Sequence, residues 1–294
     1  MTKRSPRILS YSLAASLLVS GLLAGGGTAA NADTSPAAPR AGTPAAAAQA
    51  AAIAENFLKH LMTGRHATDQ TAGSMQTIDG QTHVQSNNWA GYADTGSGFR
   101  KVSGSWTEPS GNCGLDMQSL AAFWVGIDGF KSSSVEQDGT LVECNLGTEY
   151  HYTWWEMYPS NSVQMVGSTV AAGDHITSSV TRSGSNYTLR VIDHTHPSNS
   201  FSTTQTCSSG CANSSAEWVA ESPSGGFLGN YPLADFGTWN ATGSAATGSS
   251  GSGSITSFKD NQVTMTGSLG DTMATPSGLS NGGRDFSVTW NSSS

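Results

Sequence analysis

Short aromatic or β-branched runs, separated by glycine, serine and other turn-forming residues, make up the chain from about His83 to Ser294. Their spacing is nearly regular, and no amphipathic helical pattern stands out after Met62. Many short strands with turns between them are typical of an antiparallel β-sandwich or β-barrel. Roughly 210 residues suffice for one such domain with a substantial core. The expected strands are 88–93, 100–107, 120–127, 141–144, 150–157, 162–166, 175–182, 186–193, 200–205, 215–221, 235–239, 254–259, 262–266 and 285–290.

The first 32 residues predict a secretory signal peptide. Basic residues precede a mostly apolar stretch over 8–24, and an A-x-A cleavage pattern follows at 30–32. A membrane anchor is the weaker alternative, because serine and glycine interrupt an already short apolar run. Since no later stretch reaches about 18 consecutive apolar residues, we expect a secreted, extracellular protein with no membrane attachment after signal removal.

Residues 33–82 differ in composition from the β pattern that follows them. Proline, alanine, threonine and serine dominate the first part, which is typical of a flexible segment. Over 45–62, an alanine run followed by apolar residues at helical spacing predicts a short helix that stops at Gly64. Such a helix has little core of its own. Residues 33–82 are therefore a linker or, in an exported chain, a propeptide, and the domain covers 83–294.

The domain carries few charges, and most of them are acidic. Between His83 and Ser294 there are seven Lys plus Arg and seventeen Asp plus Glu residues, a formal charge of −10. Nucleic acids and anionic membranes bind basic patches, so neither is expected as a partner. A protein with few charges also tolerates acid, because protonation of its carboxylates leaves little net positive charge to repel itself.

Four cysteines lie in the domain, and an exported chain allows disulfides. Four cysteines permit three connectivities. We favour Cys207–Cys211, which closes the turn T-C-S-S-G-C, together with Cys113–Cys144, which ties the loop before residue 123 to the chain after Gln137. A zinc site is the alternative, but C-x3-C without a second close pair does not match the usual ligand spacing.

Two familiar catalytic or metal-binding patterns are set aside. Residues 278–282 read G-L-S-N-G and match the G-x-S-x-G nucleophile pattern, which works only at a strand-to-helix turn, whereas a terminal strand follows here. His194 and His196 would face the same side of a strand, yet no nearby third ligand is evident. We interpret them as surface histidines and expect neither a metal nor a cofactor.

The stretch 123–159 concentrates candidate chemistry. Its two apolar or aromatic runs end in the carboxylates Asp128 and Glu156, and the carboxamide of Gln137 lies in a turn-rich link between them. Because side chains alternate along a strand, a strand over 152–158 brings four of them to one face: Tyr152, Trp154, Glu156 and Tyr158. A carboxylate in an aromatic row is costly to bury without partners. The face is either a substrate groove or a solvated sheet face with ordinary cross-strand aromatic pairs.

A second pair of acids occurs in the run A-E-W-V-A-E-S-P. Glu217 and Glu221 are four residues apart and share one face of a strand. Glu221 follows three apolar residues, which would partly desolvate it. A carboxylate near a bound water can act as general base, and the neutral amide of Gln137 can donate to a developing oxyanion. Glu221 and Gln137 also fit plain polar positions at strand ends.

Six short motifs, taken in order, resemble the glutamic peptidases, also called eqolisins. They are S-N-N-W-A-G-Y (86–92), S-G-S-W-T-E-P (103–109), F-W-V-G-I-D-G (123–129), E-Q-D-G (136–139), W-W-E-M-Y-P (154–159) and A-E-W-V-A-E (216–221). The resemblance covers 86 to at least 221, with weaker matching through Phe236 and the C-terminal strands. It implies an exported, acid-acting endopeptidase that folds as a concanavalin-like sandwich of two seven-stranded antiparallel sheets.

Carried over residue by residue, Gln137 and Glu221 match the catalytic residues of that family, and Glu217 looks like a neighbour. The resemblance implies direct attack by water, with Glu221 as base and then acid and Gln137 holding the carbonyl oxygen. The alanine-rich start and the Gly/Ser-rich stretch 243–253 are unlike the fungal members. The residues that match the lining or support of the family's groove are Trp89, Trp124, Asp128, Trp154, Glu156 and Tyr158.

Two other functions remain open at this point. An aromatic face can stack on sugars without doing chemistry, which describes a carbohydrate-binding sandwich. A glycoside hydrolase would use Glu156 and Glu221 as acid and nucleophile, and would leave Gln137 dispensable. The glutamic-peptidase interpretation instead expects polypeptide substrates, and we expect the protein to be a monomer.

Overall fold

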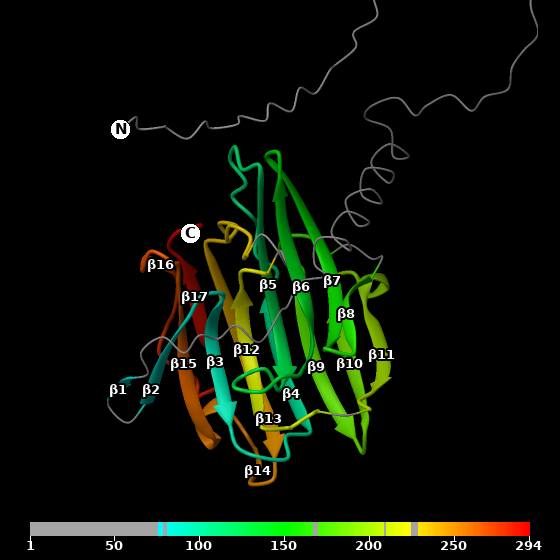
Figure 1. Cartoon of the computed structure of the whole chain (residues 1–294). Coiled ribbons are helices and arrows are strands. Elements are labelled where there is room, and N and C mark those ends of the chain that lie inside the picture. Colours follow the sequence, from blue (N-terminus) through cyan, green and yellow to red (C-terminus); the bar gives the residue numbers. More distant parts are fainter. Residues whose placement is uncertain (1–75, 79–80, 167–169, 209, 225–228) are drawn as a thin grey trace, which may run out of the picture.

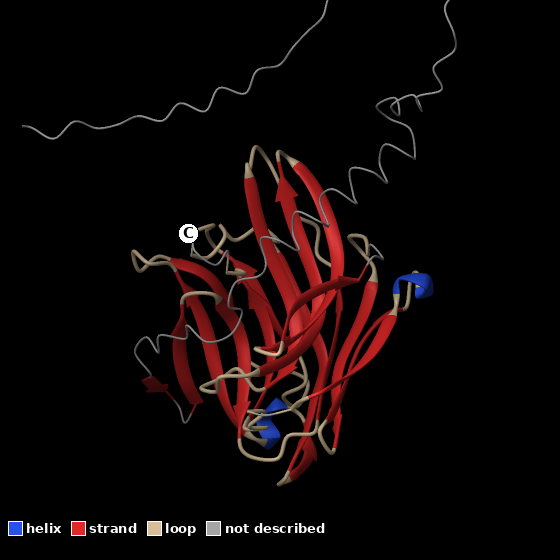
Figure 2. Cartoon of the chain, turned by 45° about the vertical axis from the view of Figure 1, so that its right-hand side comes forward, coloured by secondary structure: helices blue, strands red, loops and turns tan. Residues whose placement is uncertain are grey.

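The computed structural model describes residues 76–78, 81–166, 170–208, 210–224 and 229–294. In these ranges the strands pack as two layers face to face, and helical residues are confined to short 3-10 turns (Figures 1 and 2). Every strand pairing is antiparallel except that between β2 and β15. Of the two architectures that the strand pattern allows, the β-sandwich is therefore the correct one.

The elements are numbered in chain order. They are β1 (Gln76–Ile78), β2 (Gln81–Ser86), β3 (Trp89–Thr95), β4 (Lys101–Thr107), β5 (Gln118–Ile127), β6 (Val135–Asn145), β7 (Thr148–Tyr158), β8 (Asn161–Val166), β9 (His175–Ser183), β10 (Asn186–Asp193), η1 (Pro197–Asn199), β11 (Phe201–Thr206), β12 (Ser215–Glu221), β13 (Thr238–Gly248), β14 (Gly251–Gly253), η3 (Ile255–Ser257), β15 (Lys259–Thr266), β16 (Thr272–Pro276) and β17 (Phe286–Trp290).

Hydrogen-bonded pairing gives the strand order of each layer. The first runs β1-β2-β15-β3-β12-β5-β6-β7-β8. The second runs β11-β10-β9-β4-β13-β17-β16, with β14 as a short hairpin partner of β13. The β15–β16 pairing joins the two layers at one edge. Without the β1–β2 hairpin, each layer in the described ranges holds seven strands, as the family resemblance implies.

The main core lies between the layers and combines aliphatic side chains with a group of packed aromatic rings. The ring of Trp239 stacks on Phe123 at 5.5 Å and meets Trp106 edge-on at 5.7 Å. In the second layer, β4, β9 and β10 alternate buried and more exposed positions along each strand, because one face meets this core and the other meets solvent. Each fully buried aromatic side chain contributes about 1.5–3 kcal/mol to folding.

A second apolar cluster lies on the opposite face of the first layer. It includes Trp89, Trp124, Trp154 and Val219, which alternate along their strands with residues of the main core. Strands β3, β5 and β12 are therefore buried on both faces, unlike those of the second layer. The candidate functional face is the one that carries this second cluster.

The structure corrects several local expectations. Gln137 does not lie in a turn-rich link, because β6 begins at Val135 and is buried almost throughout. The polar letters E-Q-D-G resemble a turn, yet hydrogen bonds to β5 and β7 on both sides hold them extended. The Gly/Ser-rich stretch after 243 continues β13 to Gly248. The expected strand over 254–259 contains η3, and β16 had no predicted counterpart.

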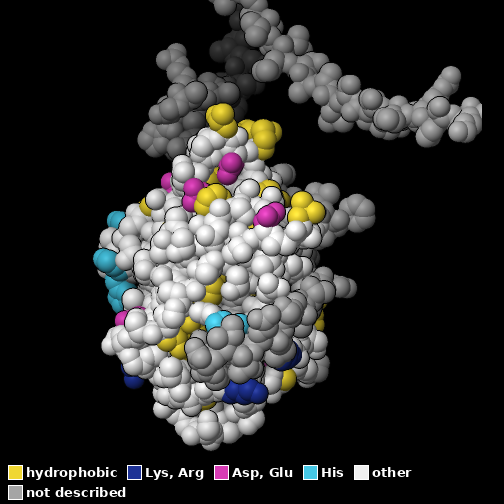
Figure 3. Space-filling view, turned by 90° about the vertical axis from the view of Figure 1, so that its left-hand side faces the viewer, with side chains coloured by type: hydrophobic (Ala, Val, Ile, Leu, Met, Phe, Trp, Pro, Cys, Tyr) yellow, Lys and Arg dark blue, Asp and Glu magenta, His cyan; other side chains and the backbone are white. Residues whose placement is uncertain are grey.

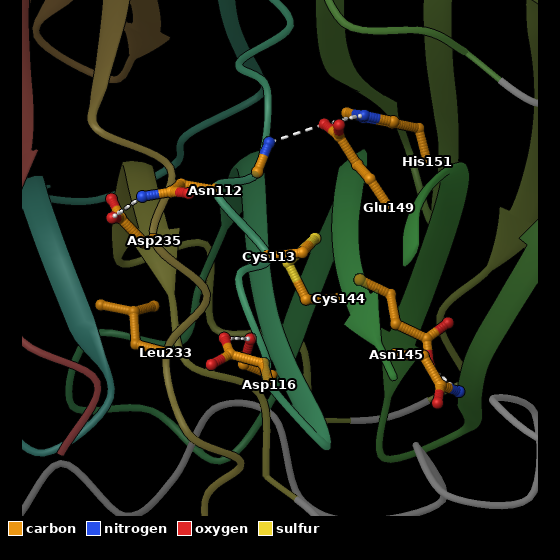
Figure 4. The surroundings of a disulfide bond; sticks show 12 residues. Asn112, Cys113, Asp116, Cys144, Asn145, Glu149, His151, Leu233 and Asp235 are labelled. Carbon is orange, nitrogen blue, oxygen red and sulfur yellow. Dashed lines mark hydrogen bonds and ion pairs between the residues drawn. A yellow bond between two sulfur atoms is a disulfide. The ribbon is translucent and has the colours of Figure 1, made fainter. Parts of the chain in front are cut away.

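Both favoured disulfides are confirmed. Cys113 pairs with Cys144, and Cys207 pairs with Cys211. The first fastens the loop before β5 to the end of β6 (Figure 4). Beside it, the Glu149 carboxylate accepts hydrogen bonds from the backbone N–H of Gly111 at 2.6 Å and contacts the His151 ring at 2.7 Å. The disulfide and the Gly111–Glu149 hydrogen bond thus both hold this loop against the sheet.

The end of the molecule beyond this disulfide exposes three large apolar side chains, and the face drawn in Figure 3 is mostly uncharged. Leu115, Met117 and Leu146 are 98%, 75% and 70% exposed. The space-filling view shows apolar atoms gathered at the top, and much of the face is covered by uncharged side chains and backbone (Figure 3).

No helix in the described ranges is long and apolar enough to cross a membrane.

The N-terminal expectations fall mostly outside the described residues. The predicted signal peptide over 1–32 and the predicted helix over 45–62 both lie there. The expected domain start at residue 83 falls within β2. Residues 81 and 82 consequently belong to a strand that pairs with β15, in the same layer as the candidate site.

Many of the domain's acids are buried, and Asp94 is the clearest case. Its side chain is 0% exposed, and in the described structure neither carboxyl oxygen has a hydrogen-bond partner. Burial raises the pKa of Asp94 to about 9, and the nearby charge of Asp260 adds to the effect. Burial, followed by the charge of Asp128, likewise raises the pKa of Glu136 to about 9. These two carboxyl groups are protonated in the folded protein below that pH.

Stability should therefore fall as pH rises. The unfolded chain releases the Asp94 proton near its ordinary pKa of about 4, whereas the folded chain keeps it until about pH 9. Between these values each such group lowers the free energy of unfolding by up to about 1.4 kcal/mol per pH unit. We expect Asp94→Asn to show a smaller drop in melting temperature between pH 4 and 8 than the unmodified chain. The exposed control Asp271→Asn should keep the full drop; parallel curves for all three would contradict the assignment.

Candidate functional site

Strand β12 positions the two candidate glutamates. It is hydrogen-bonded to β3 on one side and to β5 on the other, and all seven of its residues are buried. Alternation directs Trp218 into the main core between the layers and Val219 into the second apolar cluster. Glu217 and Glu221, at odd positions like Val219, therefore share the outer face, as the sequence predicts.

The register aligns the outer-face residues in three rows across β3, β12, β5, β6 and β7. These are Trp89, Glu221, Ala122, Leu141 and Tyr152; then Gly91, Val219, Trp124, Gly139 and Trp154; then Ala93, Glu217, Gly126, Gln137 and Glu156. Glu217 thus shares a row with Gln137, with Gly126 between them. Glu221 lies four residues further along, a backbone offset of about 13 Å along the strands.

The Glu221 carboxylate is wholly buried and receives hydrogen bonds on both oxygens. Trp124 Nε1 donates to Oε2 at 2.8 Å, and Asn88 Nδ2 donates to Oε1 at 3.1 Å. An ionised carboxylate only accepts hydrogen bonds, so two N–H donors suit its charged form. Asn88 was missed as a site residue in the sequence. The only signal for it was its position beside Trp89 in the first family motif.

The Gln137 amide is held by the acid next to it in the row. Its Nε2 donates to Glu156 Oε2 at 2.6 Å, which leaves the second N–H of the amide for another acceptor. In the described structure its Oε1 is buried without a hydrogen-bond partner. The interaction with Glu156 fixes which way round the amide lies.

The indole of Trp124 spans the interval between Glu221 and Gln137. Its Nε1 contacts Glu221, while the far edge of its six-membered ring lies over Gly126. A methyl group at Gly126 would meet Trp124 Cζ3 at 2.9 Å and Gln137 Cβ at 3.3 Å. The absence of a side chain at Gly126 thus makes room for both neighbours. Trp124 also packs edge-on against Trp89, with ring centroids 4.9 Å apart.

Glu217 lies nearer to Gln137 in the row but is a poor candidate for a base. It is 0% exposed, its Oε1 has a long 3.4 Å contact with the Phe130 backbone N–H, and its Oε2 has no partner in the described structure. Burial raises the pKa of Glu217 well above the ordinary value for a glutamic acid, and the Asp128 charge adds to the shift. A protonated carboxyl group does not accept a proton from water.

The remaining expected groove residues divide between lining and support. Trp154 belongs to the second apolar cluster and Tyr158 packs against it, and the Trp154 Nε1 donates to the backbone oxygen of Thr140 at 3.0 Å. Asp128 instead accepts hydrogen bonds from the backbone of Asn213 at 2.6 Å and of Ser214 at 2.8 Å. It fastens the loop before β12 to the end of β5, which is a supporting role.

The two histidines set aside in the sequence lie apart from this face. His194 contacts Thr177, whereas His196 Nδ1 lies 2.9 Å from Asp174 and 4.0 Å from Asp193. The sequence shows no third ligand near His196, but the fold brings Asp174 and Asp193 beside it. Asp193 accepts hydrogen bonds from the N–H groups of the following turn, so the cluster shapes that turn.

The site is closed in the full chain. Gln137, Glu221 and Trp124 are each 0% exposed, and Glu156 is 1% exposed. The geometry places a carboxylate with two N–H donors, an oriented amide and the Trp124 ring on one buried face of the sheet.

Comparison with known proteins gives matches over the part of the chain that carries these residues. The sequence profile of the Peptidase A4 family matches residues 87–290. Aspergillopepsin-2 of Aspergillus niger is 28% identical over 193 residues, which cover 58% of this chain and 68% of that protein. The fold is similar to that of scytalido-glutamic peptidase with a peptide-based transition state analog, with a TM-score of 0.59 and 24% identity over 70% of this chain and 98% of that one. SCP-B, an eqolisin solved with the tripeptide Ala-Ile-His, gives a TM-score of 0.56 and 22% identity over the same shares.

The packing around Gly126 predicts the effect of adding a single methyl group. Gly126→Ala forces Trp124 or Gln137 to move, since the new Cβ would lie 2.9 Å from the indole. Overpacking of this kind costs about 1–3 kcal/mol and should lower the melting temperature by roughly 2–10 °C. Gly278→Ala is the matched control, because nothing lies within 4 Å of its added Cβ. Equal melting temperatures for the two variants, measured by calorimetry, would show that the outer face is not tightly packed at Gly126.

Proposed function

Because this chain belongs to the Peptidase A4 family, the glutamic endopeptidases, we propose that it cleaves polypeptides by direct attack of water, using Glu221 and Gln137. The observation that carries this proposal is the buried Glu221 carboxylate, which has an N–H donor on each oxygen. Glu221 also shares one sheet face with the oriented amide of Gln137. No covalent acyl-enzyme is needed in this mechanism.

Glu221 is the base that activates water. Asn88 and Trp124 each donate to one Glu221 oxygen, and because a carboxylate oxygen can accept more than one hydrogen bond, a water molecule can bind beside these donors. Glu221 takes a proton from that water as the water oxygen attacks the carbonyl carbon of the scissile bond. The protonated Glu221 then gives this proton to the departing amine, which restores the carboxylate.

Gln137 stabilises the negative charge that develops on the carbonyl oxygen. A neutral amide donates an N–H without titrating, so it works across the pH range in which Glu221 is charged. The contact with Glu156 holds the amide in one orientation before the substrate arrives. One such donor contributes about 3–4 kcal/mol to the transition state, or about 10²–10³ in rate.

The buried acids support action in acid. Burial raises the pKa values of Asp94 and Glu136 to about 9, and those of Asp138 and Glu217 also rise. These groups are neutral at low pH, so the fold carries little internal repulsion there. Activity should still fall at very low pH, because Glu221 must be ionised to accept a proton.

Activation requires the outer face to open. The site residues are buried in the full chain, and a peptide substrate cannot reach them in that state. We propose that the protein is exported, that the signal peptide ends at Ala32, and that a second cut between about Gly64 and Ser86 frees the mature domain. Ser86 contacts Asn88, so the activating cut should leave it attached to the domain.

We expect N-terminal sequencing of the secreted, active enzyme to give a start between residue 64 and Ser86. The start follows the change from an alanine-rich to a β-type composition. The uncut form should be inactive in acid until cleavage. A fully active enzyme that begins at Asp33 and stays intact would contradict the proposed propeptide.

The dyad is tested by three single substitutions. Glu221→Gln keeps the size of the side chain but removes the base, so turnover of a chromogenic peptide should fall by about 10²–10⁴. Gln137→Ala should lose about 10²–10³. Glu217→Gln should be milder, because a protonated Glu217 is not the base. The double substitution at Gln137 and Glu221 should be little worse than Glu221→Gln alone, because residues that act as a unit are not additive.

Each variant is first checked for an unchanged melting temperature and tryptophan emission. An inactive Glu217→Gln beside an active Glu221→Gln would move the base to Glu217, which shares a row with Gln137. Full activity of both would refute the glutamic dyad. Cleavage of polysaccharide and not of denatured casein would favour the glycoside-hydrolase alternative.

A further inference from the structure

Asn88 connects the end of β2 to the proposed catalytic carboxylate. Its side chain is buried, at 5% exposure, between Ser86 and Glu221. Its Nδ2 donates to Glu221 Oε1 at 3.1 Å, and its Oδ1 accepts from the Ser86 hydroxyl at 3.1 Å. Asn88 therefore forms the middle of a short chain of hydrogen bonds.

The Ser86 hydroxyl determines the orientation of the Asn88 amide. Ser86 Oγ accepts N–H bonds from the backbone of Asn88 at 3.3 Å and of Trp89 at 3.1 Å. With its acceptor positions occupied, the hydroxyl directs its own hydrogen to Asn88 Oδ1. The Asn88 NH₂ group then faces Glu221 and can only donate to it.

The backbone fixes the same geometry independently of the side chains. The N–H of Ser222, the residue after Glu221, donates to the Asn88 carbonyl oxygen at 2.8 Å. Trp89 and Glu221 are directly paired across β3 and β12. The Asn88 amide and the Glu221 carboxylate thus come from two segments whose relative position is set by strand pairing.

We infer that Asn88 is a positioning residue for the reaction, held in turn by Ser86, and that it acts through Glu221 without touching the substrate. This inference rests on the proposed role of Glu221 as base. Together with Trp124, Asn88 prevents rotation of the carboxylate and favours its charged form, because the hydrogen bond is stronger to a charged acceptor. The last residue of β2, outside the 87–290 family match, is consequently part of the working site.

The test uses Asn88→Ala in the full chain, with Asn87→Ala as the matched control. The neighbouring Asn87 is the same residue type, and only its backbone oxygen has a hydrogen bond in the described structure, from Asn230. After activation, Asn88→Ala should lower kcat by about 10- to 100-fold with little change in KM. The acid limb of its kcat/KM profile should shift to higher pH, because the carboxylate loses a donor. Asn87→Ala should keep both the rate and the profile.

Asn88→Asp gives a readout that loss of packing would not produce. A protonated aspartic acid can donate to Glu221 from the same position, whereas an ionised one repels it. This variant should be more active than Asn88→Ala at the acid end of the profile and less active toward neutral pH. Ser86→Ala, which keeps Asn88 but removes its orienting partner, should lose a smaller factor of about 3 to 10 and shift the acid limb in the same direction.

Glu221→Gln serves as the reference that separates the two proposals. If it is inactive while Asn88→Ala, Asn88→Asp and Ser86→Ala keep the normal rate and profile, Asn88 is no positioning residue and the dyad survives. If Glu221→Gln is active, the dyad itself fails. Should Asn88→Ala melt below the assay temperature, Ser86→Ala decides alone: a normal kcat with an unshifted acid limb would overturn the inference.

Discussion

The pairing of β12 with a strand on each side is the constraint on which the rest of the site depends. A strand hydrogen-bonded to β3 and β5 cannot slip by one residue without sending its whole outer set of side chains into the core. Trp218 secures the inner set, since its indole N–H donates to the Ser103 backbone oxygen of the facing layer at 2.9 Å. Glu217 and Glu221 are held on the outer face by the same register.

The buried acids of the domain differ in the hydrogen-bond donors that reach their carboxyl oxygens. Asp94 has no partner in the described structure, and burial raises its pKa to about 9. Glu217 has one long contact, and its pKa also rises. Glu221 differs because an indole N–H and an amide N–H are directed at its two oxygens. Two glutamates four residues apart on one strand thereby meet different surroundings, because one lacks close hydrogen-bond donors and the other has a donor on each oxygen.

The face around these acids is shaped by the absence of side chains as much as by their presence. Gly126 leaves space for the Trp124 ring and for Gln137, and Gly139 would bring an added Cβ within 2.0 Å of the Phe123 carbonyl oxygen. The Trp124 ring therefore spans the interval between the proposed base and the oriented amide. The β1–β2 hairpin extends this layer beyond the seven strands of the sandwich, and its last residue contacts the site through Asn88.

The sequence by itself predicted an antiparallel sandwich or barrel and the shared face of Glu217 and Glu221, because these depend on local alternation and on turn residues. The family resemblance indicated the sandwich, and both favoured disulfides are confirmed. The family resemblance also singled out Gln137 and Trp124, which the structure brings to that face. Only the tertiary structure decided that Gln137 lies within a strand, since E-Q-D-G reads as a turn until β5 and β7 pair with it. It also revealed Asn88, 133 residues from Glu221 along the chain. The difference between the two glutamates had the same origin: hydrogen-bond donors from distant segments converge on one of them, and no local pattern records that convergence.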